Sequence, residues 1–213
     1  MIKEFTCGIL DSNTYVVWEE NTREGMIIDC GVNPLTVHPY ISENKLEIKY
    51  IVLTHGHFDH CEYLESYCNY YQNAKILCHV DELTVLGDIE GNLSSWGNNP
   101  RRYEADYLLV KEGDAFTLGN EKSGGECMTF TILHTPGHTP GGICILFEKE
   151  KIMFTGDTIF LHSYGRTDFK YGSSHILFES LRRLLSLDPK IFFYPGHYQS
   201  STIGVERNYY GMD

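Results

Sequence analysis

A cluster of histidines directly after an apolar strand constrains this sequence more than any other feature. Residues 48–53 are mostly apolar and predict a buried β-strand, which leads straight into Thr54-His55-Gly56-His57-Phe58-Asp59-His60. His55 and His57 are two positions apart, so in an extended chain their side chains point the same way. Asp59 and His60 follow where the chain turns into a helix. Imidazole and carboxylate groups are ligands that zinc, iron and manganese accept, so segment 54–60 predicts a metal site.

Three later segments have a common layout, in which a predicted strand is followed by a short turn containing glycine and then by a histidine or an aspartate. They are Thr135-Pro136-Gly137-His138, Thr155-Gly156-Asp157 and Pro195-Gly196-His197. Any one of these alone favours a structural explanation, and a polar loop rich in histidine is the corresponding alternative for segment 54–60. All of them together favour a metal centre built from several strand ends.

The order of the predicted elements indicates two sheets covered by helices. Strands are expected at 13–18, 26–29, 48–53, 75–78, 129–133, 143–147, 151–155 and 191–194. Helices are expected after Pro34, from about residue 59 to 71, from about residue 81, and around 177–185, and residues 91–105 predict a long loop. Strands followed by helices in each half are typical of paired sheets with helices outside. Without a linker or a tandem repeat, we expect a single domain over residues 1–213.

Composition and charge exclude several classes of partner. The 213 residues are 42% hydrophobic and 22% charged, which is typical of a globular protein with a packed core. The formal net charge of −12 repels phosphate backbones, and without a basic run to offset it we expect no nucleic-acid partner. We see neither a signal peptide nor the roughly 20 apolar residues of a membrane span, so no membrane partner is expected. The seven scattered cysteines fit reduced thiols, so we expect a cytoplasmic protein.

The ordered motifs resemble those of the metallo-β-lactamase superfamily and, within it, the compact hydroxyacylglutathione hydrolases of the glyoxalase II type. The resemblance is carried by segment 54–60, Thr135-Pro136-Gly137-His138-Thr139-Pro140-Gly141-Gly142, Thr155-Gly156-Asp157-Thr158 and Pro195-Gly196-His197. It covers nearly the whole chain, from Asp29 to His197. It implies an α/β fold, an αββα sandwich of two mixed β-sheets flanked by helices, with the site at one edge of the sheets.

The resemblance also implies seven ligands for two divalent metal ions, which we expect to be zinc, with iron or manganese as alternatives. The first ion would be held by His55, His57 and His138, the second by Asp59, His60 and His197, and Asp157 would bridge both. Asp59 and Asp157 would also be the catalytic carboxylates. Asp29 resembles the family's aspartate that orients a metal-binding imidazole, and a turn-forming aspartate before Gly31 is the alternative.

Arg166 is the expected substrate-binding residue. It lies in Tyr164-Gly165-Arg166-Thr167-Asp168-Phe169, which resembles the Gly-Arg-Thr-Asp loop of compact glyoxalase II-like proteins and of persulfide dioxygenases. Its guanidinium could hold a substrate carboxylate by a bidentate contact, and a structural salt bridge to Asp168 is the alternative. His79, His134 and His162 are expected in core or surface positions rather than at a metal, and Cys61 as a small buried residue.

The implied activity is hydrolysis of a small-molecule thioester, acyl-glutathione-like, by metal-bound hydroxide. A persulfide dioxygenase using one iron held by His55, His138 and Asp157 is the alternative enzyme, and a binding protein without activity is a third hypothesis. Full-length glyoxalase II has a C-terminal helical domain that supplies much of its glutathione site, whereas the sequence after His197 is short. The acyl group, the thiol carrier and the oligomeric state therefore stay open.

Overall fold

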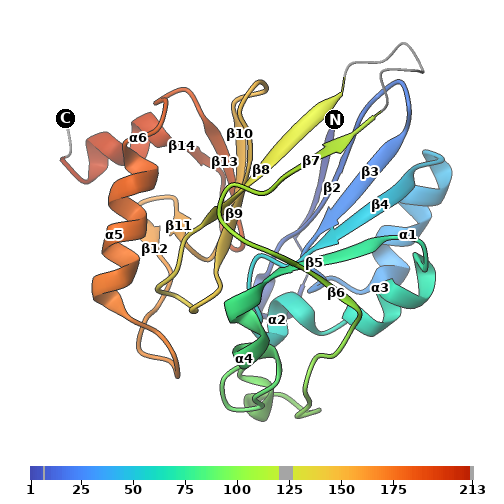
Figure 1. Cartoon of the computed structure of the whole chain (residues 1–213), viewed down its shortest axis with the longest axis horizontal. Helices are drawn as coiled ribbons and strands as arrows, with labels where there is room; N and C mark the ends of the chain where they lie inside the picture. Colours follow the sequence, from blue (N-terminus) through green and yellow to red (C-terminus); the bar gives the residue numbers. More distant parts are fainter. Residues whose placement is uncertain (7, 120–126, 212–213) are drawn as a thin grey trace.

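Two six-stranded sheets lie face to face at the centre of the protein (Figure 1). The computed structural model describes residues 1–6, 8–119 and 127–211. The first sheet has the order β1-β2-β3-β4-β5-β6. Its strands are β1 (Ile2–Phe5), β2 (Thr14–Trp18), β3 (Glu24–Ile28), β4 (Glu47–Val52), β5 (Lys75–His79) and β6 (Tyr107–Val110). The strands from β1 to β3 pair antiparallel, and those from β3 to β6 pair parallel.

The second sheet is built from the C-terminal half and has the order β14-β13-β10-β9-β8-β7. Its strands are β7 (Ala115–Leu118), β8 (Met128–His134), β9 (Ile143–Phe147), β10 (Ile152–Gly156), β13 (Phe192–Pro195) and β14 (Ser201–Thr202). The β10–β13 pair is parallel and the other pairs are antiparallel, so this sheet is mixed as well. A separate small hairpin joins β11 (Ile159–Phe160) to β12 (Ser163–Tyr164).

Helices cover the outer face of each sheet, which confirms the predicted αββα sandwich. The first sheet carries α1 (Pro34–Glu43), α2 (Phe58–Cys61), α3 (Leu64–Tyr70) and α4 (Leu83–Leu86), and the second carries α5 (Ser174–Leu185) and α6 (Ile203–Tyr209) (Figure 1). The described residues also form short 3-10 helices at η1 (Ile9–Asp11), η2 (Val80–Glu82) and η3 (Ser94–Trp96). No helix in the described ranges is long and apolar enough to cross a bilayer.

Alternation along the strands explains why the chain forms three layers of core. In β2, Tyr15 and Val17 belong to the cluster between the two sheets, whereas Val16 belongs to the cluster under α1 and α3. A third cluster packs Phe193 and Leu181 between the second sheet and its helices. Because successive strand residues point to opposite faces, strands buried on both faces must be apolar throughout. This explains the continuous apolar runs at 51–53 and 143–147.

The helix expected from residue 59 to 71 is divided in two by a tertiary contact. The backbone of Cys30 replaces two helical hydrogen bonds, because its N–H donates to the carbonyl of His60 at 2.7 Å and its carbonyl accepts from the N–H of Tyr63 at 3.0 Å. The carbonyl of Asp59, the partner that Tyr63 would have in a continuous helix, accepts from the Ser12 hydroxyl at 2.7 Å instead. Strands β6 and β7 and helix α6 were not predicted, since each is short and lacks a clear period.

The strands that precede the four motifs end at one edge of the sandwich. Segment 54–60 follows β4, and the other three motifs follow or end β8, β10 and β13. The two sheets are joined there by the N–H of Ile143, which donates to the carbonyl of Thr54 at 2.9 Å. Six cysteines in the described ranges are free, at 30, 61, 68, 78, 127 and 144, and Cys7 lies outside the described residues.

Candidate metal centre

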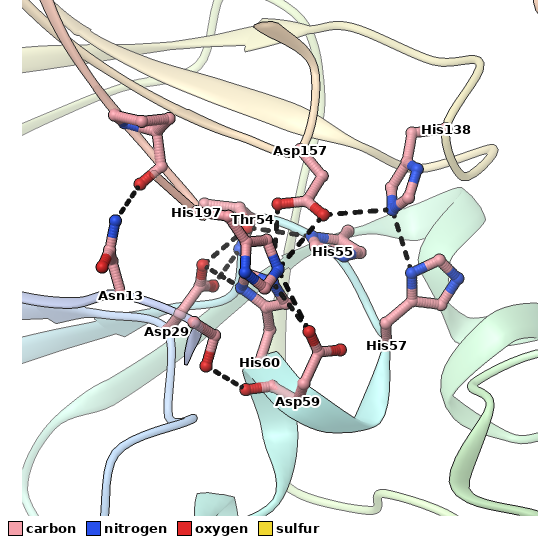
Figure 2. Close-up of polar contacts among 12 residues, drawn as sticks. Asn13, Asp29, Thr54, His55, His57, Asp59, His60, His138, Asp157 and His197 are labelled. Carbon is pink, nitrogen blue, oxygen red and sulfur yellow. Dashed lines mark hydrogen bonds and ion pairs between the residues drawn. The ribbon is translucent and has the colours of Figure 1, made fainter. Parts of the chain in front are cut away.

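Three histidines converge at the edge where the two sheets meet. One ring nitrogen of each of His55, His57 and His138 lies within 4.8 Å of the others. The Nδ1 atom of His57 is 2.9 Å from the Nε2 atom of His138, although the two residues are 81 positions apart (Figure 2). All three side chains are buried, with at most 4% of their surface exposed. The structure thus brings together the three residues predicted for a first ion, from both halves of the chain.

A second group forms beside the first from Asp59, His60 and His197. The Nε2 atoms of His60 and His197 are 3.2 Å apart. The Oδ2 atom of Asp59 lies 3.1 Å from the Nε2 atom of His197 and 3.5 Å from that of His60. Asp59 and His60 are aimed at this point by the short helix α2, whose first turn holds both, and His197 comes from the turn after β13.

Asp157 lies between the two groups. Its Oδ2 atom is 3.6 Å from the Nε2 atom of His138 and 3.5 Å from that of His197, and its Oδ1 atom is 3.5 Å from the Nε2 atom of His60. Figure 2 shows the carboxylate pointing into the space that the two groups share. Its place follows from Gly156, where the β10–β13 register shifts and φ is +46°. A Cβ at Gly156 would come within 2.6 Å of the Thr54 side chain, so only glycine fits this turn.

Asp29 joins the two halves of segment 54–60. Its Oδ2 atom accepts a hydrogen bond from Nδ1 of His60 at 2.8 Å and one from the Thr54 hydroxyl at 2.8 Å, and its Oδ1 atom accepts from the Thr54 N–H at 2.7 Å. A carboxylate only accepts, so Nδ1 of His60 carries a proton and Nε2 is the nitrogen that faces the site. Asp29 therefore contacts a site histidine, and it also lies in the turn before Gly31.

Two further contacts orient the first group in the same way. The Thr54 hydroxyl has one proton, which Asp29 accepts, so its oxygen accepts from Nδ1 of His55 at 3.1 Å. Nδ1 of His138 donates to the backbone carbonyl of Arg166 at 2.7 Å. Both rings consequently present an Nε2 lone pair to the centre. In all three cases the proton is held on the side of the ring away from the shared space.

Arg166 approaches the site through its backbone rather than its guanidinium. The guanidinium donates to both carboxylate oxygens of Asp168, at 2.9 and 2.7 Å, lies over the ring of Phe169 at 4.4 Å, and is 63% exposed. The neighbouring Gly165 is tightly confined, because a Cβ there would lie 1.9 Å from the carbonyl oxygen of Asp157. The Gly-Arg pair thus supports the two site residues His138 and Asp157 by close backbone packing.

The carboxylates of the site favour a positive charge on His60 and His197, whose pKa values they raise against the effect of burial. Burial and the neighbouring rings lower the pKa values of His55 and His57 well below their usual range. Burial also opposes a charge on His60, but Asp59, Asp157 and Asp29 raise its pKa to about 10. Burial likewise works against ionised Asp59, yet its histidine neighbours hold its pKa below the ordinary value. A bound metal cation can therefore replace the histidine proton as the positive charge beside these carboxylates.

The donors fit divalent cations. Nε2 of His55 and Oδ1 of Asp157 are buried without a hydrogen-bond partner among the described residues, which a folded protein rarely tolerates at a site of no function. The pairs His57–His138 and His60–His197 bring ring nitrogens to 2.9 and 3.2 Å. Five imidazoles and two carboxylates that converge on one space are the donor set that zinc and iron take.

A third cluster, His79, Asp81 and His134, also lies within 4.8 Å but has different geometry. The rings of His79 and His134 are stacked 3.8 Å apart at 12°, so their lone pairs lie in parallel planes and do not converge. Nδ1 of His79 accepts from the Asp81 N–H at 3.2 Å, and Nε2 of His134 lies 2.8 Å from the carbonyl of Pro140. This agrees with the packing position expected for both histidines. Cys61 is fully buried under α2, also as expected.

The loop at 91–105 brings an exposed aromatic side chain close to the first group. Trp96, on η3, is 64% exposed and packs edge-on against Phe169 with ring centroids 5.4 Å apart. Phe169 in turn packs against the ring of His57 at 5.7 Å. On the side of the second group, a surface pocket of about 580 Å³ opens beside His197, Asn13 and Tyr198. The site is thus accessible between an aromatic wall and a more polar pocket.

Sequence reasoning missed three buried polar residues that support the site: Ser12, Asn13 and Glu82. Each exposes at most 2% of its surface. No local pattern marks them, because their partners lie between 26 and 185 positions away. A buried polar residue without a partner nearby in sequence becomes visible only when the fold is known.

Comparisons with known proteins agree with this geometry. Residues 7–197 match the family model described as the metallo-beta-lactamase superfamily. The hydroxyacylglutathione hydrolase GloC of Haemophilus influenzae is 31% identical over 92% of this chain and 89% of that protein. Among solved structures, the BLEG-1 B3 metallo-beta-lactamase has a TM-score of 0.86 and 30% identity, covering 98% of this chain and 97% of its own.

A second solved structure, TTHA1623 in a di-iron-bound form, has a TM-score of 0.82 and 29% identity and covers 96% of each chain. The family model spans every motif of the candidate centre, and the relative and both structures cover more than nine tenths of the chain. The chain therefore belongs to the metallo-beta-lactamase superfamily.

Proposed function

We propose that this protein is a hydrolase with two divalent metal ions that cleaves small-molecule thioesters of the acyl-glutathione type. The observation that carries the proposal is the position of Asp157 between two three-residue groups, 3.5 to 3.6 Å from a nitrogen of each. His55, His57 and His138 would hold one ion, Asp59, His60 and His197 the other, and Asp157 would contact both. The hydroxyacylglutathione hydrolase among the relatives supports the choice of a thioester.

The chain's own residues prepare the site for this chemistry. Two bound divalent ions would supply an activated water as the nucleophile and a Lewis acid for the thioester carbonyl. Asp29 holds a proton at Nδ1 of His60, and the carbonyl of Arg166 holds one at Nδ1 of His138, so the opposite nitrogens stay free to bind. These contacts fix the rings before any substrate arrives, which removes a reorganisation cost from the reaction.

Substrate specificity is expected to come from the two sides of the opening. The wall of Trp96 and Phe169 offers an apolar and aromatic surface, whereas the pocket beside His197 is lined by polar side chains. Arg166 is exposed at the rim of the same wall, and exchange of Asp168 for a substrate carboxylate would bring its guanidinium into use. The thiol carrier would then be recognised by a carboxylate at this rim.

The test is release of free thiol from S-lactoylglutathione and from simple acyl thioesters by purified protein loaded with zinc, iron or manganese. We expect turnover by the loaded protein and its loss in Asp157→Asn, which keeps the shape of the side chain but not its charge. Glu206→Gln, a change at a buried carboxylate outside the centre, is the matched control and should retain turnover.

Metal analysis of protein purified without added metal separates the proposal from its alternative. Two ions per chain are expected for the hydrolase. One iron per chain, together with oxygen uptake on glutathione persulfide and no thiol release from thioesters, would contradict the proposal in favour of a persulfide dioxygenase. A metal-loaded protein that left every thioester intact and took up no oxygen would contradict both activities.

A further inference from the structure

We propose that each half of the metal centre is positioned by its own brace of buried polar residues outside the ligand set. Glu82 braces the first group, and the pair Ser12–Asn13 braces the second. The inference rests on the proposed metal-dependent function and adds to it the residues that set the affinity of each half. All three are positioning residues, since they contact the segments that carry the ligands and not the ligand atoms.

Glu82 joins the two segments that carry His57 and His138. Its Oε1 atom accepts from the N–H of Gly56 at 2.7 Å, and its Oε2 atom accepts from the N–H of Gly141 at 2.7 Å and from the Thr139 hydroxyl at 3.0 Å. Gly56 precedes one of the two histidines, and Thr139 follows the other. Glu82 is 1% exposed, so water cannot replace these bonds without opening the structure.

The glycines on both sides of Glu82 show how closely the two segments approach it. A Cβ at Gly141 would lie 2.4 Å from the Glu82 backbone nitrogen and 2.6 Å from its Oε2 atom. A Cβ at Gly56 would lie 3.1 Å from its Oε1 atom. One carboxylate therefore sets the separation of two loops that are 85 positions apart at Gly56 and Gly141, and with it the 2.9 Å approach of the His57 and His138 nitrogens.

Ser12 and Asn13 do the same for the second group from the start of β2. The Ser12 hydroxyl donates to the carbonyl of Asp59 at 2.7 Å. The Asn13 side-chain amide donates to the carbonyl of Pro195 at 3.0 Å, a contact drawn in Figure 2, and to that of Tyr198 at 3.3 Å. Its backbone N–H donates to the carbonyl of Gly196 at 2.7 Å. These acceptors surround His197 on both sides, so two consecutive residues hold the turns that carry Asp59 and His197.

The two braces share no partner, which makes the inference specific. Among the described residues, the side-chain hydrogen bonds of Glu82 go to the segments at 56 and 139–141, and those of Ser12 and Asn13 go to 59 and 195–198. Loss of one brace should therefore loosen one half of the centre. A purely structural role would lower the stability of the fold without distinguishing between the two halves.

The experiment measures Zn²⁺ affinity, by competition with a chromophoric chelator, in two backgrounds that each isolate one half. His197→Ala removes a residue of the second group, so binding in this variant measures the first ion. His57→Ala removes a residue of the first group, so binding there measures the second ion. We expect Glu82→Gln, which keeps one acceptor oxygen and loses the other, to weaken binding about tenfold to a hundredfold in the His197→Ala background and to leave it unchanged in the His57→Ala background. Asn13→Ala and Ser12→Ala should give the opposite pattern.

Glu206→Gln is the matched control for a buried carboxylate. Glu206 is fully buried and accepts from the His162 N–H at 2.8 Å and from the Ser201 hydroxyl at 2.6 Å, but these partners carry no ligand. It should lower the urea concentration at the midpoint of unfolding and leave both zinc affinities unchanged. If Glu82→Gln fails to fold, Thr139→Val removes one of the three bonds and should produce a smaller loss at the first ion only.

The inference is overturned if each brace variant weakens both ions in the same proportion, or if neither ion is affected. If a background binds no zinc, the same comparison is made in the otherwise unchanged chain, where Glu82→Gln should weaken one of the two binding steps. Failure of the unchanged chain to bind any metal would instead overturn the proposed function, so the two failures are distinguishable.

Discussion

Replacement of Asp29 by asparagine tests one hydrogen bond between a supporting carboxylate and a site histidine. The carboxylate accepts from Nδ1 of His60 at 2.8 Å and from the N–H and hydroxyl of Thr54 at 2.7 and 2.8 Å. Asparagine has nearly the same shape, tolerates the φ of +60° at this position, and can still accept from the Thr54 N–H. Its amide nitrogen can accept neither from His60 nor from the Thr54 hydroxyl. The ring must therefore give up its contact or move its proton to Nε2, and the hydroxyl must turn.

The expected magnitude follows from which bonds are lost. Loss of a supporting hydrogen bond to a metal-binding histidine costs about tenfold to a hundredfold in affinity, or roughly 1.4 to 2.8 kcal/mol at 1.4 kcal/mol per factor of ten. Asp29→Ala should be more severe, because it strands the buried Thr54 N–H at a cost of about 1–3 kcal/mol and places alanine in the left-handed region at a further cost of about 1–2 kcal/mol. Alanine should therefore destabilise the fold, and asparagine mainly the metal site.

The assay combines a zinc titration of the metal-free protein with urea unfolding. We expect Asp29→Asn to weaken the ion bound by the group that contains His60, with a small change in the unfolding midpoint. Asp168→Asn, a change at an exposed carboxylate, is the control and should alter neither measurement. Asp29→Asn protein that binds both ions as tightly as the unchanged chain would refute the reasoning about the His60 proton.

The remaining predictions concern the first group and the loop beside it. His57→Ala should lose the first ion and most thioester hydrolysis. Two ions per chain by elemental analysis, together with near-normal turnover, would rule out its assignment as a ligand. Arg166→Ala keeps the backbone carbonyl that contacts His138, so we expect an unchanged metal content. In steady-state kinetics we expect KM to rise more than kcat falls. An unchanged KM would show that the Arg166 guanidinium serves only its salt bridge to Asp168. Gly165→Ala places a methyl group 1.9 Å from the carbonyl oxygen of Asp157. We expect this overpacking to lower the free energy of unfolding in urea by about 1–3 kcal/mol. An unchanged unfolding midpoint would show that the loop can accommodate the methyl group.

The expected strands, the paired sheets and the outer helices were confirmed because they depend on local patterns. Strand β4 is mostly apolar and ends in the buried pair Ile51-Val52. Helix α5 has buried leucines at 177, 181, 184 and 185, which is the period of a helix with one buried face. The helix expected from residue 59 was wrong in its continuity. Its break depends on Cys30, which lies far away in sequence and has no local signal.

The side chains of the centre could be chosen from the sequence because metal ligands are few in type and follow strand ends. Their ring orientations could not, since each depends on a partner from another segment, such as Asp29 for His60. Arg166 illustrates the difference. Its motif marked it as a functional residue, whereas the tertiary structure shows its carbonyl against His138 and its guanidinium paired with Asp168.

The amino-acid sequence by itself determined the types of the candidate ligands, their order along the chain, and the alternation that buries each strand. These depend on residues close together in the chain, where side-chain direction follows from backbone period. Only the tertiary structure decided which nitrogen of each ring faces the shared space, where Asp157 lies between the groups, and which buried residues hold Gly56, Gly141 and Gly196 in place. Those features depend on hydrogen bonds between residues tens to hundreds of positions apart, which exist only once the two sheets have packed.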